Sequence, residues 1–279
     1  MLIILIGITY NNTMQIRDAK PSDKQAVLNF CKDTFSWGDY ISDVWDFWIL
    51  QGNLFVAIEN DVPIGLSHLV FIDNRQAWLE GIRIHPNHRR KGYGRRIISH
   101  CESIANSKTI RMIIESDNPP SIDLAKSMGY NIEDWWRLYA LTPKKETSSV
   151  VLASDINQVT RFVSSYTYVD SWKWLPLESS DLEELMRQKR ILLSVQNGRV
   201  LAMGIWNESK NFANVLLLGF INGTDEGMLD ILRFIQNKGH ELHSERIQVF
   251  SQAKNILEME SLTKRPLFYL MKKDLKKNL

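Results

Sequence analysis

The sequence predicts an α+β fold, a mixed central sheet flanked by helices, that occurs twice along the chain. Three observations support this prediction. A strand, a basic glycine-containing loop and an amphipathic helix follow one another between Trp78 and Asn106. Further strand and helix patterns surround this segment in the first half. Two of these strands return in the second half at an offset of 137 residues, Leu54 falling on Ile191 and Ile110 on Ile247.

The segment from Trp78 to Asn106 carries the clearest pattern. Residues 78–84 are rich in β-branched and aromatic side chains, and Pro86 ends that strand. A helix is expected after the loop, because apolar residues recur there on one helical face. These residues are Ile97, Ile98, Cys101, Ile104 and Ala105. Gly92 and Gly94 lie in the loop, where a missing side chain allows a tight turn and leaves backbone N–H groups uncovered.

The loop predicts a binding site for an anion. The first N–H groups of a helix lack partners within the helix, and the helix dipole is positive at that end. Five basic side chains surround this point: Arg89, Arg90, Lys91, Arg95 and Arg96. A phosphate or diphosphate suits such a site best. The residues after Gly92 fit neither the dinucleotide fingerprint nor the nucleotide P-loop.

The loop sequence Arg89-Arg-Lys-Gly92-Tyr-Gly94 fits the pattern Arg/Gln-x-x-Gly-x-Gly/Ala after a strand. On this motif the chain resembles the GNAT superfamily of acyl-CoA-dependent N-acyltransferases, in which such a loop holds the diphosphate of coenzyme A. The resemblance covers residues 14–141, the expected catalytic domain, and implies acetyl-CoA as the cofactor. It implies cofactor contacts from a strand, the loop and one asparagine. These residues are Ile82, Arg83, Ile84, Arg89, Arg90, Lys91, Gly92, Tyr93, Gly94, Arg95 and Asn118.

The element order expected for residues 14–141 is that of the GNAT fold. Strands are expected at 15–17, 54–59, 63–72, 78–84, 110–114 and 135–140. Helices are expected from Ser22 or Asp23, at 42–51, at 93–106 and at 120–128. We expect the strand 135–140 to close the sheet of this domain.

Glu80 is the expected general base that takes a proton from the acceptor amine. It shares one side of its strand with Ile82 and Ile84, and a carboxylate is costly to bury there without a partner or a role. The alternative is a structural salt bridge, for example to Arg111 on the adjacent strand. Glu115 is a second candidate base, more typical of a strand-end residue that faces solvent.

The general acid stays unassigned at this point. The resemblance places a tyrosine of the family at the position of Ala125, so either another group serves or the thiolate leaves unaided, since a thiol pKa is about 8.5. His68 and His85 are alternative acid–base groups. We expect structural roles for both, because a lone histidine near a strand end is more often structural.

The segment between the first two helices is expected to wall the acceptor pocket. Trp37, Asp39 and Tyr40 are the expected substrate-binding residues, because an aspartate beside aromatic rings suits a cationic amine. Trp45 and Trp48 have the spacing of a buried helical stripe, so we expect core packing for both. Gly38-Asp-Tyr-Ile, Trp48-Ile and Leu79-Glu-Gly-Ile-Arg83 also resemble the branch of histidine α-N-acetyltransferases, although this resemblance is the weaker one.

The second half is expected to be a degenerate copy of the first. Residues 142–149 are polar and predict a linker, and residues 150–279 form the expected second domain. At the same offset, Gly92 and Gly94 correspond to Leu229 and Ile231, and Glu80 corresponds to Leu217. Neither the anion loop nor the base is therefore expected there. An unrelated α+β domain is the alternative.

Two further segments of the second half carry expectations. The aromatic run 166–174 is expected to cover or narrow the acceptor pocket, or alternatively to pack the core of the second domain. The tail from Met271 to Leu279 is lysine-rich and is expected to be a solvated basic end.

Composition excludes some other classes of protein. A net charge of +2 over 279 residues gives no reason to expect a nucleic-acid partner. Residues 1–13 are apolar but shorter than the roughly 20 residues of a membrane span, so we expect an upstream start or an extra edge strand there and no membrane partner. Cys31 and Cys101 are expected to be core thiols of a cytoplasmic protein, and no metal cluster is expected.

These observations predict an N-acetyltransferase that moves an acetyl group from acetyl-CoA directly to a primary amine of a small molecule, an amino acid or an amine. A homodimer is one expected assembly. The alternatives are a protein N-terminal or lysine acetyltransferase and a non-catalytic acyl-CoA sensor.

Overall fold

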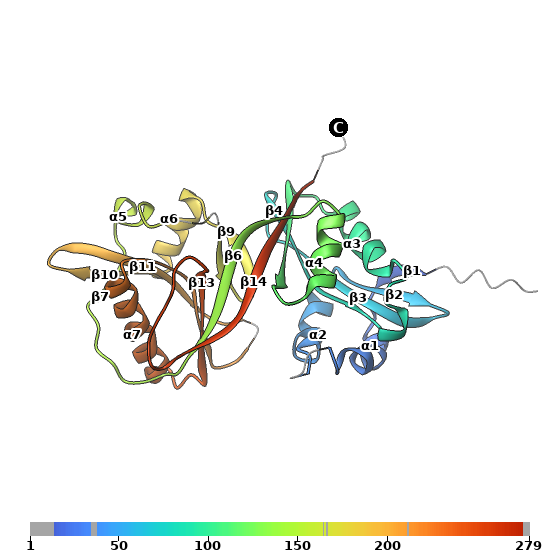
Figure 1. Cartoon of the computed structure of the whole chain (residues 1–279), viewed down its shortest axis with the longest axis horizontal. Coiled ribbons are helices and arrows are strands. Elements are labelled where there is room, and N and C mark those ends of the chain that lie inside the picture. The colour runs from blue at the N-terminus through green and yellow to red at the C-terminus, as the bar shows by residue number, and fades with distance from the viewer. Residues whose placement is uncertain (1–13, 35–37, 164, 166, 211, 276–279) are drawn as a thin grey trace, which may run out of the picture. The chain divides into compact units, whose positions relative to one another are not determined.

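The computed structural model describes residues 14–34, 38–163, 165, 167–210 and 212–275. Contacts divide the chain into two compact units (Figure 1). The first holds the described residues up to Phe71 together with Leu79–Asn106, and the second holds Ile72–Trp78 and the residues from Ser107 onward. The predicted domain boundaries at residues 142–149 divide the chain differently and stay a prediction from sequence.

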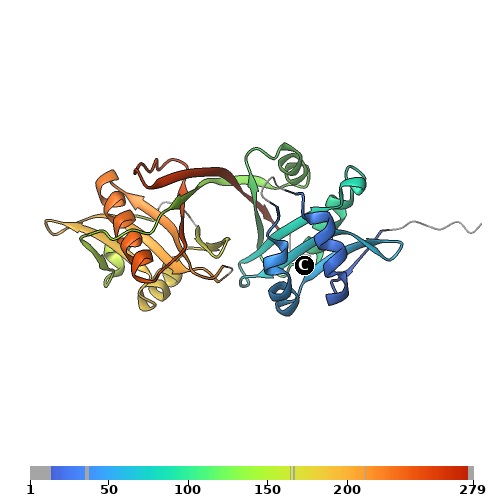
Figure 2. The same ribbon diagram turned by 90° about the horizontal axis from the view of Figure 1, so that it is seen from below.

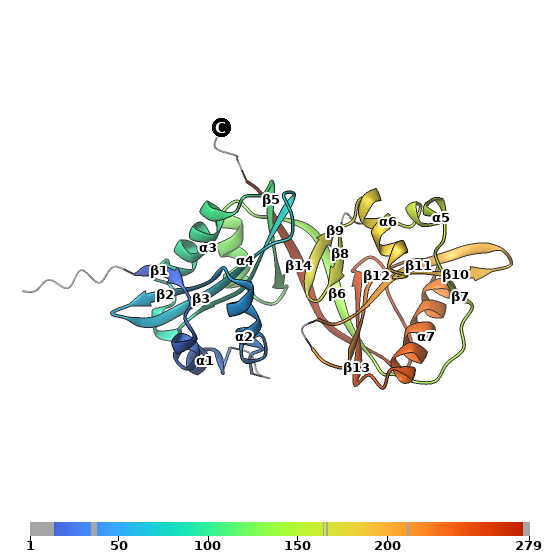
Figure 3. The same ribbon diagram turned by 180° about the vertical axis from the view of Figure 1, so that it is seen from behind.

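The first unit is a sheet with helices on both faces (Figure 3). Its strands run in the order β1 (Gln15–Asp18), β2 (Leu54–Glu59), β3 (Val62–Phe71) and β4 (Gln76–Ile84), of which β4 contributes Leu79–Ile84. Its helices are α1 (Lys24–Cys31), α2 (Ile41–Gln51) and α3 (Tyr93–Ile104), with the short 3-10 helices η1 (Pro21–Asp23) and η2 (Pro86–His88).

Strand β2 shows why this sheet is apolar on both faces. Leu54, Val56 and Ile58 pack against α1 and α2, whereas Ala57 packs with Ile97 of α3. Successive side chains of a strand point to opposite faces, so a strand covered on both sides has a continuous apolar run instead of an alternating one. Residues 54–58 are accordingly all buried.

The second unit contains the remaining elements. They are β5 (Thr109–Glu115), α4 (Pro119–Ser127), β6 (Asn131–Leu141), β7 (Val150–Leu152), α5 (Ile156–Thr160), β8 (Thr167–Asp170), β9 (Lys173–Pro176), α6 (Ser179–Arg187), β10 (Ile191–Gln196), β11 (Arg199–Glu208), β12 (Val215–Gly223), α7 (Asp225–Glu241), β13 (Arg246–Gln252) and β14 (Leu262–Asp274). From the first residues of β4, its sheet runs β4-β5-β14-β6-β13-β12-β11-β10-β7. Helix α7 lies along one face of this sheet (Figure 2), with Met228, Ile231 and Ile235 in the core.

The two longest strands of the second unit are exchanged between the halves of the sequence. Strand β14, from the end of the second half, pairs antiparallel with β5, from Phe268↔Glu115 to Asp274↔Thr109. Strand β6, from the end of the first half, pairs with β13, from Ile247↔Leu141 to Gln252↔Trp136. The two strands also pair with each other and lie side by side in green and red in Figure 1. Each half therefore supplies a strand to the sheet of the other.

This exchange corrects two expectations. The strand at 135–140 does not close the sheet of the first half, because β14 lies between it and β5. The tail is not a solvated basic end as far as Asp274, because these residues belong to β14 and Met271 is completely buried. Its lysines hid the strand pattern, since Lys272 and Lys273 interrupt the apolar run.

The second half repeats most of the element order of the first, with the hairpin β8–β9 added between α5 and α6 and no described helix between β13 and β14. Strands β10 and β11 and strand β13 lie at the predicted offset of 137 residues from β2, β3 and β5. No helix among the described residues combines the length and the apolar character needed to cross a membrane.

Replacing Leu270 by alanine tests the exchange of β14. Leu270 is fully buried and pairs with Ile113 of β5 and Asp134 of β6. Such a truncation in a core costs about 2–5 kcal/mol, so we expect the free energy of unfolding to fall by that amount in a denaturant titration. Thr263→Ala, at an exposed position of the same strand, is the control and should change it by less than about 0.5 kcal/mol. Equal effects of the two variants would contradict the pairing of β14 with β5.

Candidate active site

The centre of the candidate site is the point where Trp48 of α2 lies against β4. Gly81 has a φ of +68°, and a Cβ at this position would lie 2.6 Å from the Trp48 ring. Any residue other than glycine is disfavoured at position 81, because the positive φ is strained for it and its Cβ would clash with the Trp48 ring. The predicted core role of Trp48 is confirmed, since its side chain is 2% exposed. Its ring also stacks on His68 of β3, with the ring centroids 4.5 Å apart.

Glu80, the expected base, is hydrogen-bonded to His68. The distance from its Oε1 to His68 Nδ1 is 2.9 Å, and the other ring nitrogen, Nε2, lies 3.1 Å from the carbonyl oxygen of Gly52. The Glu80 side chain is 11% exposed and that of His68 is fully buried. Glu80 is therefore mostly buried, and the ring that it contacts is held at both nitrogens.

Arg111 is the alternative partner expected for Glu80, but its side chain pairs with other residues. That guanidinium donates to Glu133 at 2.6 and 2.8 Å and also to Gln76. His68 is expected from the sequence to be a lone structural histidine, and the sequence did not reveal its pairing with Glu80. It lies in the otherwise apolar run of β3, so the burial argument used for Glu80 applied equally to it.

Asp39 is paired with Arg83 of β4. The two Arg83–Asp39 hydrogen bonds are 2.7 and 3.1 Å long, and the Asp39 side chain is 2% exposed. Arg83 therefore balances the charge of Asp39, and the expected role of Asp39 in binding a cationic amine stays a prediction. These two hydrogen bonds also fix the orientation of the Arg83 guanidinium.

Tyr40 is the second of the expected acceptor residues that the structure describes. The Arg83 guanidinium carbon lies 5.3 Å from its ring centre, and its ring meets Trp48 edge-on. Burial raises the pKa of Tyr40, although the nearby Arg83 acts in the opposite direction. Its hydroxyl is therefore neutral near pH 7. The third expected residue, Trp37, lies outside the described residues.

The expected anion loop has the geometry of an uncapped helix N-terminus. Gly92 is the N-cap of α3, with a φ of +79°, and no side chain caps the helix there. A Cβ at Gly92 would have no atom within 4 Å, so the space beside the N-cap residue is not filled by a neighbour. The side chains of Arg89, Arg90, Lys91, Arg95 and Arg96 are all exposed. This donor set fits a diphosphate.

Several contacts fix the shape of this loop. Arg89 Nε donates to the carbonyl oxygen of Ile84 at 3.2 Å, and Arg96 donates to that of Met14 at 2.6 Å. Glu59, at the end of β2, accepts from the Tyr93 hydroxyl at the start of α3 and pairs with His88. Glu59 is thus a loop-positioning residue that the sequence did not reveal, because it resembles an ordinary residue at a hairpin turn.

The strand before the loop has a short ladder with β5. The parallel pairing runs from Gln76↔Thr109 to Trp78↔Arg111, and no described residue of β4 beyond Trp78 takes part in it. Asn118 lies in the second unit and caps α4, its Oδ1 accepting from the Ser121 N–H at 3.3 Å. Its contact with a cofactor, like those of Ile82 and Ile84, stays a prediction.

The two cysteines are buried, as expected. Burial raises the pKa of the Cys101 thiol to about 11 and that of Cys31 to about 12. Both thiols are therefore protonated near pH 7 and are poor nucleophiles. Among the described residues no cluster of three or more metal-binding side chains occurs.

Two features of this site are missing from the described residues of the second half. Thr224 caps α7 by accepting from the Gly227 N–H at 3.2 Å, and the first turn carries Asp225 and Glu226. These carboxylates repel an anion at the N-terminus of α7, whereas basic side chains surround the N-terminus of α3. Leu217 of β12 is fully buried at the position that corresponds to Glu80.

The aromatic run of the second half packs the core of its own unit. Trp174 is fully buried and contacts Trp78, Trp136 and Phe250. A Cβ at Gly219 of β12 would lie 1.8 Å from the carbonyl oxygen of Val169. The backbone of the β8–β9 hairpin therefore packs directly against the backbone of β12. For the described residues 167–174 the core-packing alternative is therefore the correct one.

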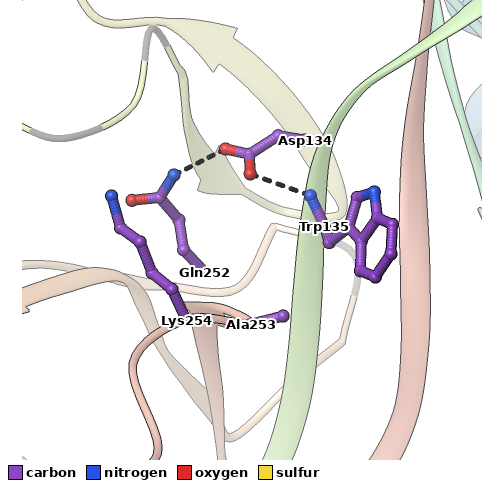
Figure 4. Close-up of a pocket in the computed structure, with 5 residues that line it drawn as sticks. All are labelled: Asp134, Trp135, Gln252, Ala253 and Lys254. Atoms are coloured by element: carbon purple, nitrogen blue, oxygen red, sulfur yellow. Dashed lines mark hydrogen bonds between the residues drawn. The ribbon is translucent and has the colours of Figure 1, made fainter.

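A pocket of about 370 Å³ lies elsewhere in the second unit (Figure 4). It is lined by Asp134, Trp135, Gln252, Ala253 and Lys254. The Asp134 carboxylate accepts hydrogen bonds from Gln252 at 2.7 Å and from the Trp135 N–H at 2.8 Å. It is thus engaged in structural contacts and is not positioned as a base.

Comparisons with known proteins agree with this geometry. Residues 24–130 match the family model described as the acetyltransferase (GNAT) family. A search of curated proteins found no match.

Among solved structures, a GCN5-related N-acetyltransferase from Sphaerobacter thermophilus has 13% identity and a TM-score of 0.64, covering 95% of this chain and 97% of that one. A tandem GNAT protein from the clavulanic acid biosynthesis pathway has 12% identity and a TM-score of 0.57, covering 96% and 100%. A GCN5-related N-acetyltransferase from Anabaena variabilis has 13% identity and a TM-score of 0.51, covering 95% and 73%. At these identities the likeness shows the fold, here over both halves of the chain.

Gly81→Ala tests the packing at the centre of the site. The new methyl group meets the Trp48 ring and the positive φ adds strain, so we expect a loss of about 2–4 kcal/mol in the free energy of unfolding. Gly198→Ala is a matched control, because Gly198 has a similar φ of +74° but no atom within 4 Å of an added Cβ. It should lose only about 1–2 kcal/mol. Equal losses in denaturant titrations would show that the Trp48 contact is unimportant.

Proposed function

We propose that the chain moves an acetyl group from acetyl-CoA directly to a primary amine of a small molecule, since residues 24–130 match the acetyltransferase (GNAT) family. Members of this family use acetyl-CoA as the donor. The observation that carries the proposal is that the Glu80 carboxylate and the open N-terminus of α3 belong to one continuous segment of the first unit.

The proposed cofactor site begins at the loop. The backbone N–H groups around Gly92 and the first turn of α3 would hold the diphosphate, with the charges of Arg90 and Lys91 beside it. The backbone of Ile82 and Ile84, beyond the end of the β5 ladder, would hold the pantetheine arm. Asn118 is proposed as a further contact.

Acetyl-CoA supplies an acyl group that is already activated as a thioester. The nitrogen lone pair of the neutral amine forms the C–N bond as the C–S bond breaks, and Glu80 takes the one proton that the nitrogen must lose. The proton balance is completed when the departing thiolate is protonated, and we assign no residue to that step. Ala125, at the position of the family's tyrosine, is buried and has no ionisable group. Neither cysteine is suited to carry an acyl intermediate, which supports direct transfer.

The surroundings of Glu80 favour a small acceptor. Its side chain is 11% exposed, and Trp48 and Tyr40 lie close to it on the same unit. A slim amine reaches such a group more easily than a residue of a folded protein does. The second half, with its capped α7 and buried Leu217, is proposed to be non-catalytic.

Glu80→Gln tests the base. Removing a general base lowers turnover by about 10²–10⁴-fold, so we expect thiol release to fall by that factor while the Kd for acetyl-CoA stays the same. Glu115→Gln, at the alternative carboxylate, is the matched control and should retain native turnover. The assay uses a panel of amino acids, including histidine, polyamines, and peptides with a reactive α-amine or lysine. A preference for peptides would contradict the small-molecule acceptor, and no thiol release with any amine would favour an acyl-CoA sensor.

A further inference from the structure

His68 has a hydrogen-bond partner at each ring nitrogen, and the two partners fix its protons. The Gly52 carbonyl oxygen can only accept, so the nitrogen 3.1 Å from it, Nε2, carries a hydrogen. In a neutral ring the other nitrogen, Nδ1, would then carry a lone pair. It lies 2.9 Å from Oε1 of Glu80, which as a carboxylate oxygen also has only lone pairs. Two acceptors at this distance repel, so a second proton lies between His68 and Glu80.

Three features of the first unit favour this proton on the ring. Trp48 stacks on the imidazole at 4.5 Å, and an aromatic face attracts a cation. Gly52 is the C-cap of α2, and the C-terminal end of a helix stabilises positive charge. A carboxylate of opposite charge accepts from Nδ1. The ring is fully buried, so each of these interactions acts with little screening by solvent.

We propose that His68 is a buried imidazolium that positions Glu80 and keeps it ionised as the proton acceptor of the reaction. This inference rests on the proposed function, in which Glu80 is the base. A carboxylate with 11% of its side chain exposed is costly to bury without a partner of opposite charge, and His68 supplies that partner.

Two other titratable side chains of the first unit, Arg83 and Tyr40, lie near the pair. Arg83, on the same strand as Glu80, is paired with Asp39, which precedes α2. Tyr40, also before α2, is neutral near pH 7 because burial raises its pKa. Trp48, the residue of α2 in contact with the ring, carries no charge. His68 is hydrogen-bonded directly to Glu80, and its proposed charge therefore acts on the carboxylate at the shortest range.

The proton balance gives His68 a positioning role and not a catalytic one. The amine proton passes to the Glu80 carboxylate and then to the thiolate or to solvent, which restores the carboxylate for the next cycle. The proton on Nδ1 stays on the imidazole throughout, held by Glu80. His68 therefore contributes through charge and orientation.

His68→Asn tests this role through the pH profile. The asparagine amide keeps an N–H donor near Glu80 but removes the charge. We expect the acid limb of kcat/KM to move to higher pH, with activity near pH 6 falling about tenfold and the high-pH plateau staying within about threefold of native. His243→Asn, at an exposed turn of the second unit, is the control and should leave the profile unchanged. A uniform loss of activity at all pH values would show a merely structural histidine and overturn the proposal.

A second measurement does not depend on activity or on a His68 variant. The ¹⁵N chemical shifts of the ring report which nitrogens are protonated. We expect both nitrogens of His68 to be protonated at pH 7 in the native protein. In Glu80→Gln, where an amide can donate to Nδ1, we expect a neutral ring with its hydrogen on Nε2. A neutral His68 ring in the native protein would overturn the proposal. A protonated ring in a native protein that acetylates no amine would instead contradict the proposed function.

Discussion

The contact between the indole of Trp48 and the backbone of β4 at Gly81 is the constraint on which the candidate site depends. It requires a residue without a side chain at Gly81, in a left-handed conformation, next to the proposed base. The same indole stacks on His68, and the helix that carries it ends at Gly52, whose carbonyl binds the other side of the imidazole. Helix α2 thereby determines the backbone conformation of β4 beside Glu80, and it also holds His68, the hydrogen-bond partner of Glu80.

The strand exchange explains why the two halves of the sequence are not independent pieces. Strand β14 lies between β5 and β6, and β6 lies between β14 and β13. A strand's own residues specify which faces are buried, but they do not specify which neighbour it pairs with. The sequence therefore predicted a strand at 135–140 and missed its partner. It also missed β14, because Lys272 and Lys273 made a half-buried strand look like a solvated tail.

Local chemistry was predicted more completely than long-range pairing. The glycine and basic pattern around Gly92 predicted both the loop and a helix that begins at Tyr93. The loss of that pattern at Leu229 predicted the absence of an anion site in the second half, where Thr224 caps α7 and acidic residues follow it. The pairings Glu80–His68, Arg83–Asp39 and Tyr93–Glu59 join residues from different elements, so no local pattern could reveal them.

A crystal structure of the protein with coenzyme A bound tests the central claim most directly. The account predicts that the diphosphate oxygens accept hydrogen bonds from backbone N–H groups between Lys91 and Arg95, at the open end of α3. A loop without the diphosphate, or a nucleotide bound at the capped end of α7 instead, would contradict it.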